Sequence, residues 1–223
     1  MVISVKDLSY SYPKEYLVFE NLSVEVKEGE FWGILGRNGA GKTTFIDLLL
    51  GINYSAQGRI SILGEGPCEK RDKHPREIAF LSQDVRLNGK IKVQDFFHFH
   101  SFFYKNYSKE IEKELAEYFK LNTQSLIGAL SSGQQKKVQV VAGLASNTKI
   151  ILIDEITAVL DPEMRYRFFS KLVEFNKQKN KTIMLATNIA EDLIGRVDKI
   201  LYINDYQGQV ISPDEINRIF KTQ

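Results

Sequence analysis

Short apolar runs alternate with longer amphipathic stretches along most of this 223-residue chain. The runs typical of strands occupy residues 2–8, 22–26, 31–35, 59–63, 78–82, 150–153, 182–186 and 199–203. Helical patterns occupy residues 42–50, 162–178 and 213–220. Residues 150–153 and 182–186 are almost wholly apolar, as expected for strands that are covered on both faces of a sheet. This order predicts an α/β fold with a mainly parallel sheet.

The stretch 88–145 has a different pattern, with helical segments at about 92–105, 108–120 and 132–145 and no convincing strand. In the middle segment, apolar side chains recur at helical spacing. We therefore expect one domain spanning 1–223. Its α/β core would comprise 1–87 and 146–223, and 88–145 would form an inserted all-helical subdomain.

Aromatic residues crowd the first of these helical segments. They are Phe96, Phe97, Phe99, Phe102, Phe103, Tyr104 and Tyr107. If one helix continues through them, four share a face and are expected in the core, namely Phe96, Phe99, Phe103 and Tyr107. Phe97 and Tyr104 lie on a neighbouring face, which a small subdomain cannot readily bury as well. For these two residues, core packing and contact with a partner are both open.

The composition is that of an ordinary globular protein, with 43% hydrophobic and 26% charged residues and a net charge of +2 (30 basic minus 28 acidic). Disordered, collagen-like and disulfide-rich classes are excluded. The near-neutral charge argues against a nucleic-acid-binding arm or a polybasic membrane tether. The single cysteine, Cys68, suits a reducing compartment. No export signal or membrane-spanning run is evident, so direct membrane insertion is not expected.

The strongest chemical signal is a glycine-rich segment that fits the pattern G-x-x-x-x-G-K-[ST]. Its residues are Gly36, Arg37, Asn38, Gly39, Ala40, Gly41, Lys42 and Thr43, followed by Thr44. The segment lies between a predicted strand and a predicted helix, the context that a phosphate-binding loop requires. Glycines let consecutive N–H groups face a phosphate chain, and the helix adds its positive end. Lys42 can reach the β and γ phosphates, while the Thr43 hydroxyl can hold Mg²⁺.

Two carboxylates follow the apolar strand at 150–153. Asp154 suits Mg²⁺ ligation, and Glu155 is placed to polarise an attacking water. Alone, such a pair is more often a helix cap or a solvated loop. Together with the phosphate-binding loop, it favours nucleotide hydrolysis.

Four further motifs complete a resemblance to the ATP-binding cassette (ABC) family, the motor subunits of ABC transporters. Residues 130–135, Leu-Ser-Ser-Gly-Gln-Gln, resemble the family's signature motif, and Gln83 occupies its Q-loop position. Residues 158–161, Ala-Val-Leu-Asp, resemble its D-loop. Tyr12 matches the aromatic residue that stacks on adenine, with Tyr10 as the other choice. The order and spacing of these motifs along nearly the whole chain are more specific than any one of them.

The resemblance implies a P-loop NTPase core, an N-terminal antiparallel β subdomain and the cofactors ATP and Mg²⁺. It gives Gln83 a role in metal binding and catalysis. It also implies that two cassettes, identical or different, pack head to tail around ATP. Ser131, Gly133 and Asp161 would then contact the nucleotide that the other cassette holds.

In this family the cassette works with transmembrane subunits, so the resemblance implies a cytoplasmic protein held at the inner face of the membrane by its partner. The groove beside Gln83 would receive that partner, and Phe97 and Tyr104 are the aromatic candidates for the contact. About 20 residues follow the last predicted core strand, and the interval from Gln83 to Leu130 is short. Both features favour a simple exporter cassette over an importer cassette with a regulatory domain.

Two positions depart from the family pattern. Ser132 replaces a glycine in the signature motif, a small change that we expect the motif to tolerate. Asn188 stands where the family has a histidine that contacts the γ-phosphate, and asparagine cannot carry a positive charge. We therefore expect intact ATP binding and slowed hydrolysis. The alternative is a regulatory ATP-binding subunit with little turnover.

Other P-loop proteins agree less well with the sequence. A nucleotide kinase would lack the signature motif and Gln83, and a translation ATPase of this family carries two cassettes in one chain. Chromosome and repair ATPases separate their motifs with long coiled coils, for which there is no heptad tract. No nucleic-acid partner is expected.

Overall fold

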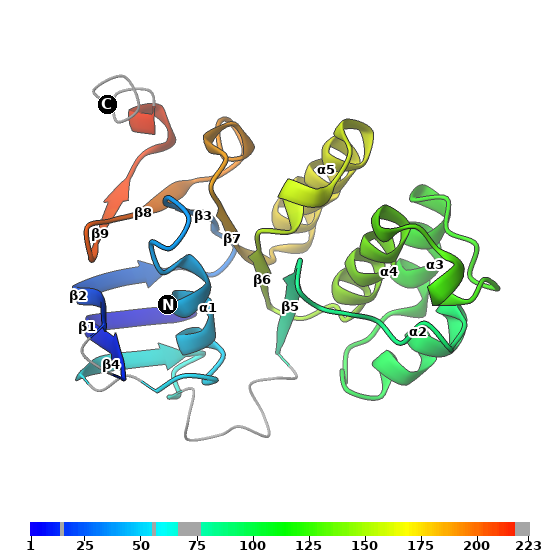
Figure 1. The fold of residues 1–223 in the computed structure, drawn as a ribbon, viewed down its shortest axis with the longest axis horizontal. Coiled ribbons are helices and arrows are strands. Elements are labelled where there is room, and N and C mark those ends of the chain that lie inside the picture. Colours follow the sequence, from blue (N-terminus) through cyan, green and yellow to red (C-terminus); the bar gives the residue numbers. More distant parts are fainter. Residues whose placement is uncertain (14–15, 55–56, 67–76, 217–223) are drawn as a thin grey trace.

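The computed structural model describes residues 1–13, 16–54, 57–66 and 77–216 (Figure 1). Ser212 and Glu215 form a capping box at the 3₁₀ turn Pro213–Glu215. The remainder of the helix predicted at 213–220 lies outside the described residues, as does Cys68. None of the described helices is long and apolar enough to cross a bilayer.

A six-stranded sheet forms the centre of the fold. Its strands are β3 (Phe31–Leu35), β5 (Ile78–Ser82), β6 (Ile150–Asp154), β7 (Thr182–Thr187), β8 (Lys199–Asn204) and β9 (Gln207–Ile211). They are arranged in the order β5-β6-β7-β3-β8-β9, and only the β8–β9 pair is antiparallel. The prediction of a mainly parallel sheet is confirmed. The edge strand β9, which carries few apolar residues, was not predicted.

A second, antiparallel sheet consists of β1 (Ile3–Tyr12), β2 (Tyr16–Val26) and β4 (Gln57–Ile62), in the order β2-β1-β4. This confirms the N-terminal antiparallel subdomain. Both β1 and β2 extend beyond the predicted runs, because their outer ends pair with each other, Tyr12 opposite Tyr16.

The helices are α1 (Lys42–Leu49), α2 (Val93–Ser101), α3 (Lys109–Tyr118), α4 (Ser132–Ala145) and α5 (Pro162–Lys179). Figure 1 shows α2, α3 and α4 together at the end of the molecule opposite the antiparallel sheet. The chain enters this group after β5 and leaves it before β6. An all-helical insertion into an α/β core is therefore present, as predicted.

Strand β3 separates two hydrophobic cores by its alternation. Trp32 and Ile34 face a core that includes α1 and the antiparallel sheet. Phe31 and Leu35 face the other core, which α5 and the helical group complete. Because β3 is covered on both faces, the loop that follows it begins from a rigid strand.

The prediction of how the aromatic residues in and after α2 pack is wrong in part. Phe97, considered for a partner contact, is fully buried, whereas Phe99 and Phe103 are 60% and 53% exposed. The helix ends at Ser101, so Phe103 does not continue its face, and the buried side follows Val93 and Phe97. Phe96 and Tyr107 are partly buried against the core, as expected.

Candidate functional site

The loop between β3 and α1 has the backbone geometry that its glycines permit. Gly39 and Gly41 have φ angles of 82° and 100°, which side chains with a Cβ rarely adopt. A Cβ on Gly41 would lie 2.6 Å from Val18 Cγ1, and one on Gly36 would lie 2.7 Å from the carbonyl oxygen of Ile203. The loop therefore requires glycine both for its turn and for its close packing on β2 and β8.

Lys42, the first residue of α1, is buried with 3% exposure. Its Nζ donates to the carbonyl oxygens of Gly36 at 2.9 Å and Arg37 at 3.0 Å, and it pairs with Glu155 Oε1 at 3.1 Å. Ala40 N donates to the Arg37 carbonyl oxygen at 3.1 Å, which closes the loop around the ammonium group. The charge of Lys42 is thus held at the centre of the loop.

Asp154, at the end of β6, has the environment of a cation ligand. Thr43 Oγ1 donates to its Oδ2 at 2.9 Å, while its Oδ1 is buried and has no hydrogen-bond partner among the described residues. Burial raises the pKa of Asp154, and the nearby Glu155 and Asp47 carboxylates raise it further. A hydroxyl beside an orphaned buried carboxylate oxygen fits Mg²⁺, which prefers oxygen ligands and relieves the unpaired charge.

Glu155 follows Asp154 with a φ angle of 51°, an uncommon conformation for a residue other than glycine. Its amide donates to the Ala186 carbonyl oxygen at 3.1 Å, and Gln83 Nε2 lies 3.4 Å from its Oε2. Lys42 holds the other carboxylate oxygen. Two sequence-predicted residues, Lys42 and Gln83, therefore both contact a third, Glu155, although the three lie far apart in the chain.

Lys42, Thr43 and Glu155 border a hollow of about 310 Å³. It is lined by Tyr12, Tyr16, Val18, Asn38, Gly39, Gly41, Lys42, Thr43, Thr44 and Glu155. Tyr12 lies at its mouth, with its hydroxyl 3.1 Å from Thr44 Oγ1. Tyr10 is buried behind it and contacts it edge to face, so Tyr12 is the tyrosine of the two that can meet a base.

Sequence reasoning missed Tyr16 and Val18, because the strand that carries them was predicted to begin only at residue 22. Tyr16 is 62% exposed and pairs with Tyr12 across the hairpin. Tyr12 and Tyr16, on either side of residues 13–15, are the sequence signal from which this longer strand could have been predicted.

Asn188 is exposed directly after β7, and its Nδ2 donates to Asn38 Oδ1 at 2.8 Å. The structure therefore brings this residue to the glycine-rich loop. Ser131, Gly133 and Asp161 lie elsewhere, outside the residues that line the hollow. Ser131 caps α4 through a capping box with Gln134, and Asp161 caps α5 by accepting from Met164 N at 2.9 Å.

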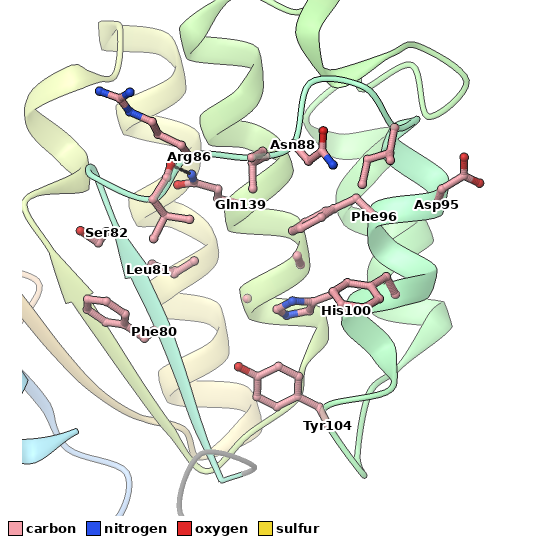
Figure 2. A pocket seen from close by; sticks show the side chains of 16 residues that line it. Phe80, Leu81, Ser82, Arg86, Asn88, Asp95, Phe96, His100, Tyr104 and Gln139 are labelled. Carbon is pink, nitrogen blue, oxygen red and sulfur yellow. Dashed lines mark hydrogen bonds between the residues drawn. The ribbon is translucent and has the colours of Figure 1, made fainter. Parts of the chain in front are cut away.

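A second, larger hollow of about 570 Å³ lies between the end of β5 and helices α2 and α4 (Figure 2). Its walls are mainly apolar and include Phe80, Leu81, Val85, Leu87, Ile91, Phe96, Phe99, Tyr104 and Ala142. Arg86 and Asp95 also border it, as does His100, whose pKa burial lowers to about 4. Tyr104 borders this hollow, whereas the buried Phe97 does not.

Comparison with known proteins gives a consistent result. Residues 19–158 match the family described as ABC transporter. The zinc uptake system ATP-binding protein ZurA of Listeria innocua is 31% identical, over 95% of this chain and 82% of that protein. The Nod factor export ATP-binding protein I of Burkholderia orbicola is 30% identical, over 85% of this chain and 64% of that protein. A solved ATP-binding subunit of an ABC transporter is 25% identical, with a TM-score of 0.88 and coverage of 99% and 94%.

Proposed function

The chain belongs to the ABC transporter family, and we propose that it is the ATP-hydrolysing motor subunit of a multi-subunit transporter. The observation that carries the proposal is the meeting of the buried Lys42, the Thr43–Asp154 pair and Glu155 at one hollow. A cation, a hydroxyl beside a carboxylate, and a second carboxylate are the groups that phosphoryl transfer to water requires. In this proposal 1–223 is one cassette, with an α/β core of 1–87 and 146–223 and a helical subdomain of 88–145.

In this site the loop 36–41 and Lys42 bind the triphosphate, and Thr44 follows at the first turn of α1. Thr43, Asp154 and Gln83 hold Mg²⁺, which when bound neutralises charge on the phosphates. Glu155 accepts a proton from the attacking water and is held toward the loop by Lys42. Tyr12 stacks on the adenine ring, and the neighbouring Tyr16 widens that aromatic surface.

The remaining motif residues act across an interface with a second cassette. Ser131 and Gly133 stand at the exposed N-terminus of α4, where a helix end favours an anion. Asp161 is exposed at the start of α5. Because these residues lie outside the hollow of their own chain, a second cassette is needed to complete each ATP site.

The larger hollow beside α2 is the proposed docking groove for a transmembrane subunit. It borders the loop that begins with Gln83, and Gln83 contacts Glu155. A partner bound in the groove can therefore act on the ATP site through a few residues. Of the two aromatic candidates from the sequence, Tyr104 lines this groove and Phe97 does not, and Phe96 and Phe99 supply further aromatic contacts. Through this partner the chain is held at the cytoplasmic face of the membrane.

Export is our proposal for the direction of transport, supported by the Nod factor export relative and by the short interval between Gln83 and Leu130. The zinc uptake relative is 31% identical and matches more of this chain than the export relative does, 95% against 85%. Inverted vesicles that contain the whole transporter distinguish the directions, because an exporter accumulates its cargo inside them when ATP is added.

Hydrolysis of MgATP by the purified chain tests the motor function. Glu155→Gln should lower the rate about 10²-fold or more while leaving ATP binding intact, because it removes the proton acceptor. Glu163→Gln, an exposed change on α5, is the matched control. A chain that binds ATP but has no turnover above that of Glu155→Gln would support the alternative, a regulatory subunit, which the Asn188 side chain favours.

A further inference from the structure

Asp192 is a carboxylate with 2% exposure that joins three separate elements. It lies in the 3₁₀ turn Ala190–Asp192, after β7. Its Oδ2 accepts from Thr157 Oγ1 at 2.7 Å and from Thr187 Oγ1 at 3.2 Å. Its Oδ1 accepts from Arg165 Nε at 2.7 Å and from the same guanidinium's terminal nitrogen. Since all these groups donate, only an acceptor-only side chain satisfies the arrangement.

Each partner of Asp192 belongs to a segment that carries a proposed ATP-site residue. Thr157 lies in the 3₁₀ turn Ile156–Val159, which begins directly after Glu155. Thr187 ends β7, immediately before Asn188. Arg165 lies near the start of α5, four residues after Asp161.

The same contacts restrain the backbone at Glu155 and Asn188. Thr187 Oγ1 also accepts from the Ile189 amide at 3.0 Å, which closes a tight turn around Asn188. Glu155 has a left-handed φ angle of 51°, and such conformations persist only where the surroundings hold them. Its amide bonds Ala186, and the turn that follows is tied to Asp192 through Thr157.

We propose that Asp192 is a positioning residue for ATP hydrolysis. It holds the segments of Glu155 and Asn188 in register with each other and with the start of α5. Asp192 lies outside the residues that line the hollow, so it acts through Thr157 and Thr187. The kinetic part of this proposal rests on the proposed function, because a small misplacement of a reacting group can cost about 10²-fold in rate.

The kinetic test compares variants of Asp192 and Thr157 in single-turnover hydrolysis of MgATP. Asp192→Asn and Thr157→Val should each lower the rate about 10-fold or more, with the Kd for ATP changed less than about 3-fold. Thr157→Ser keeps the hydroxyl and should retain the wild-type rate. Glu191→Gln removes an exposed acidic charge from the same turn and is the control. A rate for Thr157→Val equal to that of Thr157→Ser would overturn the proposal. A loss of ATP binding in both Asp192→Asn and Thr157→Val would also overturn it.

A second measurement does not depend on turnover. Hydrogen exchange of the free chain should become about 10-fold faster in peptides covering 155–160 and 187–193 of Asp192→Asn, and remain unchanged in Glu191→Gln. Unchanged exchange in Asp192→Asn would contradict the positioning role, even if the wild type proved inactive. A wild type without turnover whose Asp192→Asn variant shows the faster exchange would instead refute the motor function alone. If Asp192→Asn fails to fold, Thr157→Val replaces it, and hydrogen exchange in the peptide covering 155–160 should become faster in the same way.

Discussion

At the scale of single residues, Asp154 shows that a cation-binding carboxylate can destabilise the fold when no cation is bound. One of its oxygens accepts from Thr43, and the other is buried without a partner among the described residues. Burial raises the pKa of Asp154 in the folded chain, and the hydrogen bond from Thr43 and the charge of Lys42 only partly oppose that effect. By linkage, such a carboxyl stabilises the fold below its unfolded pKa, and this stabilisation is lost as pH rises through the folded pKa.

Asp154→Asn should therefore stabilise the free chain at neutral pH while abolishing MgATP hydrolysis. Removing a buried charge that is only partly compensated should raise the free energy of unfolding at pH 7 by about 1 kcal/mol, or the Tm by about 2–4 °C. The gain should shrink as pH falls below the raised pKa, where the wild-type carboxyl is protonated. Thermal unfolding at several pH values without nucleotide or Mg²⁺ measures this. A lower Tm for the variant at pH 7 would contradict the account.

Asn188 bonds Asn38 of the glycine-rich loop, so its side chain stands close to where a γ-phosphate would bind. Asn188→His should raise single-turnover hydrolysis by about 10²-fold, because a charged donor stabilises the transferring phosphoryl group. Asn188→Ala removes the donor without adding charge and should give no such gain. If the histidine variant is no faster than the wild type, the missing histidine does not limit hydrolysis.

At the scale of elements, helix α4 ties the signature motif to the loop after β5. Lys136 Nζ donates to the carbonyl oxygens of Gln83 and, at 3.4 Å, Ser82. Gln139 Nε2 donates to the Val85 carbonyl oxygen at 2.5 Å. The helix that Ser131 caps therefore holds the backbone of Gln83, the residue that contacts Glu155. No sequence motif marked Lys136 or Gln139 for this role, because their partners are carbonyl groups 53 or 54 positions away in the chain.

Two glycines of α4 give opposite predictions for stability. A Cβ on Gly143 would lie 2.5 Å from Leu81 Cδ2, where α4 packs on β5, whereas a Cβ on Gly133 meets nothing within 4 Å. Gly143→Ala should cost about 1–3 kcal/mol through overpacking. Gly133→Ala should add about 0.5–1 kcal/mol, because alanine favours the helix. Urea unfolding of both variants checks this, and a stabilised Gly143→Ala would show that the helix and strand separate easily.

Helix α2 shows why the buried face of a helix is harder to predict from sequence than the helix itself. The seven aromatic residues from Phe96 to Tyr107 suggested one long helix, and that length decided which of them shared a face. The helix stops at Ser101, with Phe102 in the last turn, so Phe99 and Phe103 meet each other at the surface instead of the core. Apolar spacing alone contains little information on where a helix ends.

At the scale of the whole molecule, the motif residues fall into two groups on separate parts of the surface. Lys42, Thr43 and Glu155 border the hollow after β3 and β6, whereas Ser131 caps α4, which lies in the helical group (Figure 1). An ATP site that uses both groups needs two chains. Because the Asn188 side chain carries no positive charge, a partner with a histidine at that position would supply the more active site.

We therefore expect the native transporter to contain this chain together with a different cassette. Purification through a tag on this chain, followed by native mass spectrometry of the complex with its membrane subunit, gives the composition. Equal amounts of two cassette masses, one of them the 25.6 kDa chain, are the expected result. An active complex in which every cassette has that mass would contradict the prediction.

The sequence by itself determined the α/β class, the helical insertion, the glycine-rich loop and the Asp154–Glu155 pair. The class and the insertion follow from the order of apolar runs along the chain. The loop and the carboxylate pair are local, since their groups act within a few consecutive residues. Only the tertiary structure decided that Asp192 joins Thr157 to Thr187, that Asn188 bonds Asn38, and that Tyr16 lines the hollow. Contacts between distant segments depend on the order of strands in the sheet and on where helices end. The spacing of apolar residues in the sequence indicates neither. The 223 residues therefore identify the chemistry, while the packing of β6, β7 and α5 decides how its groups are held.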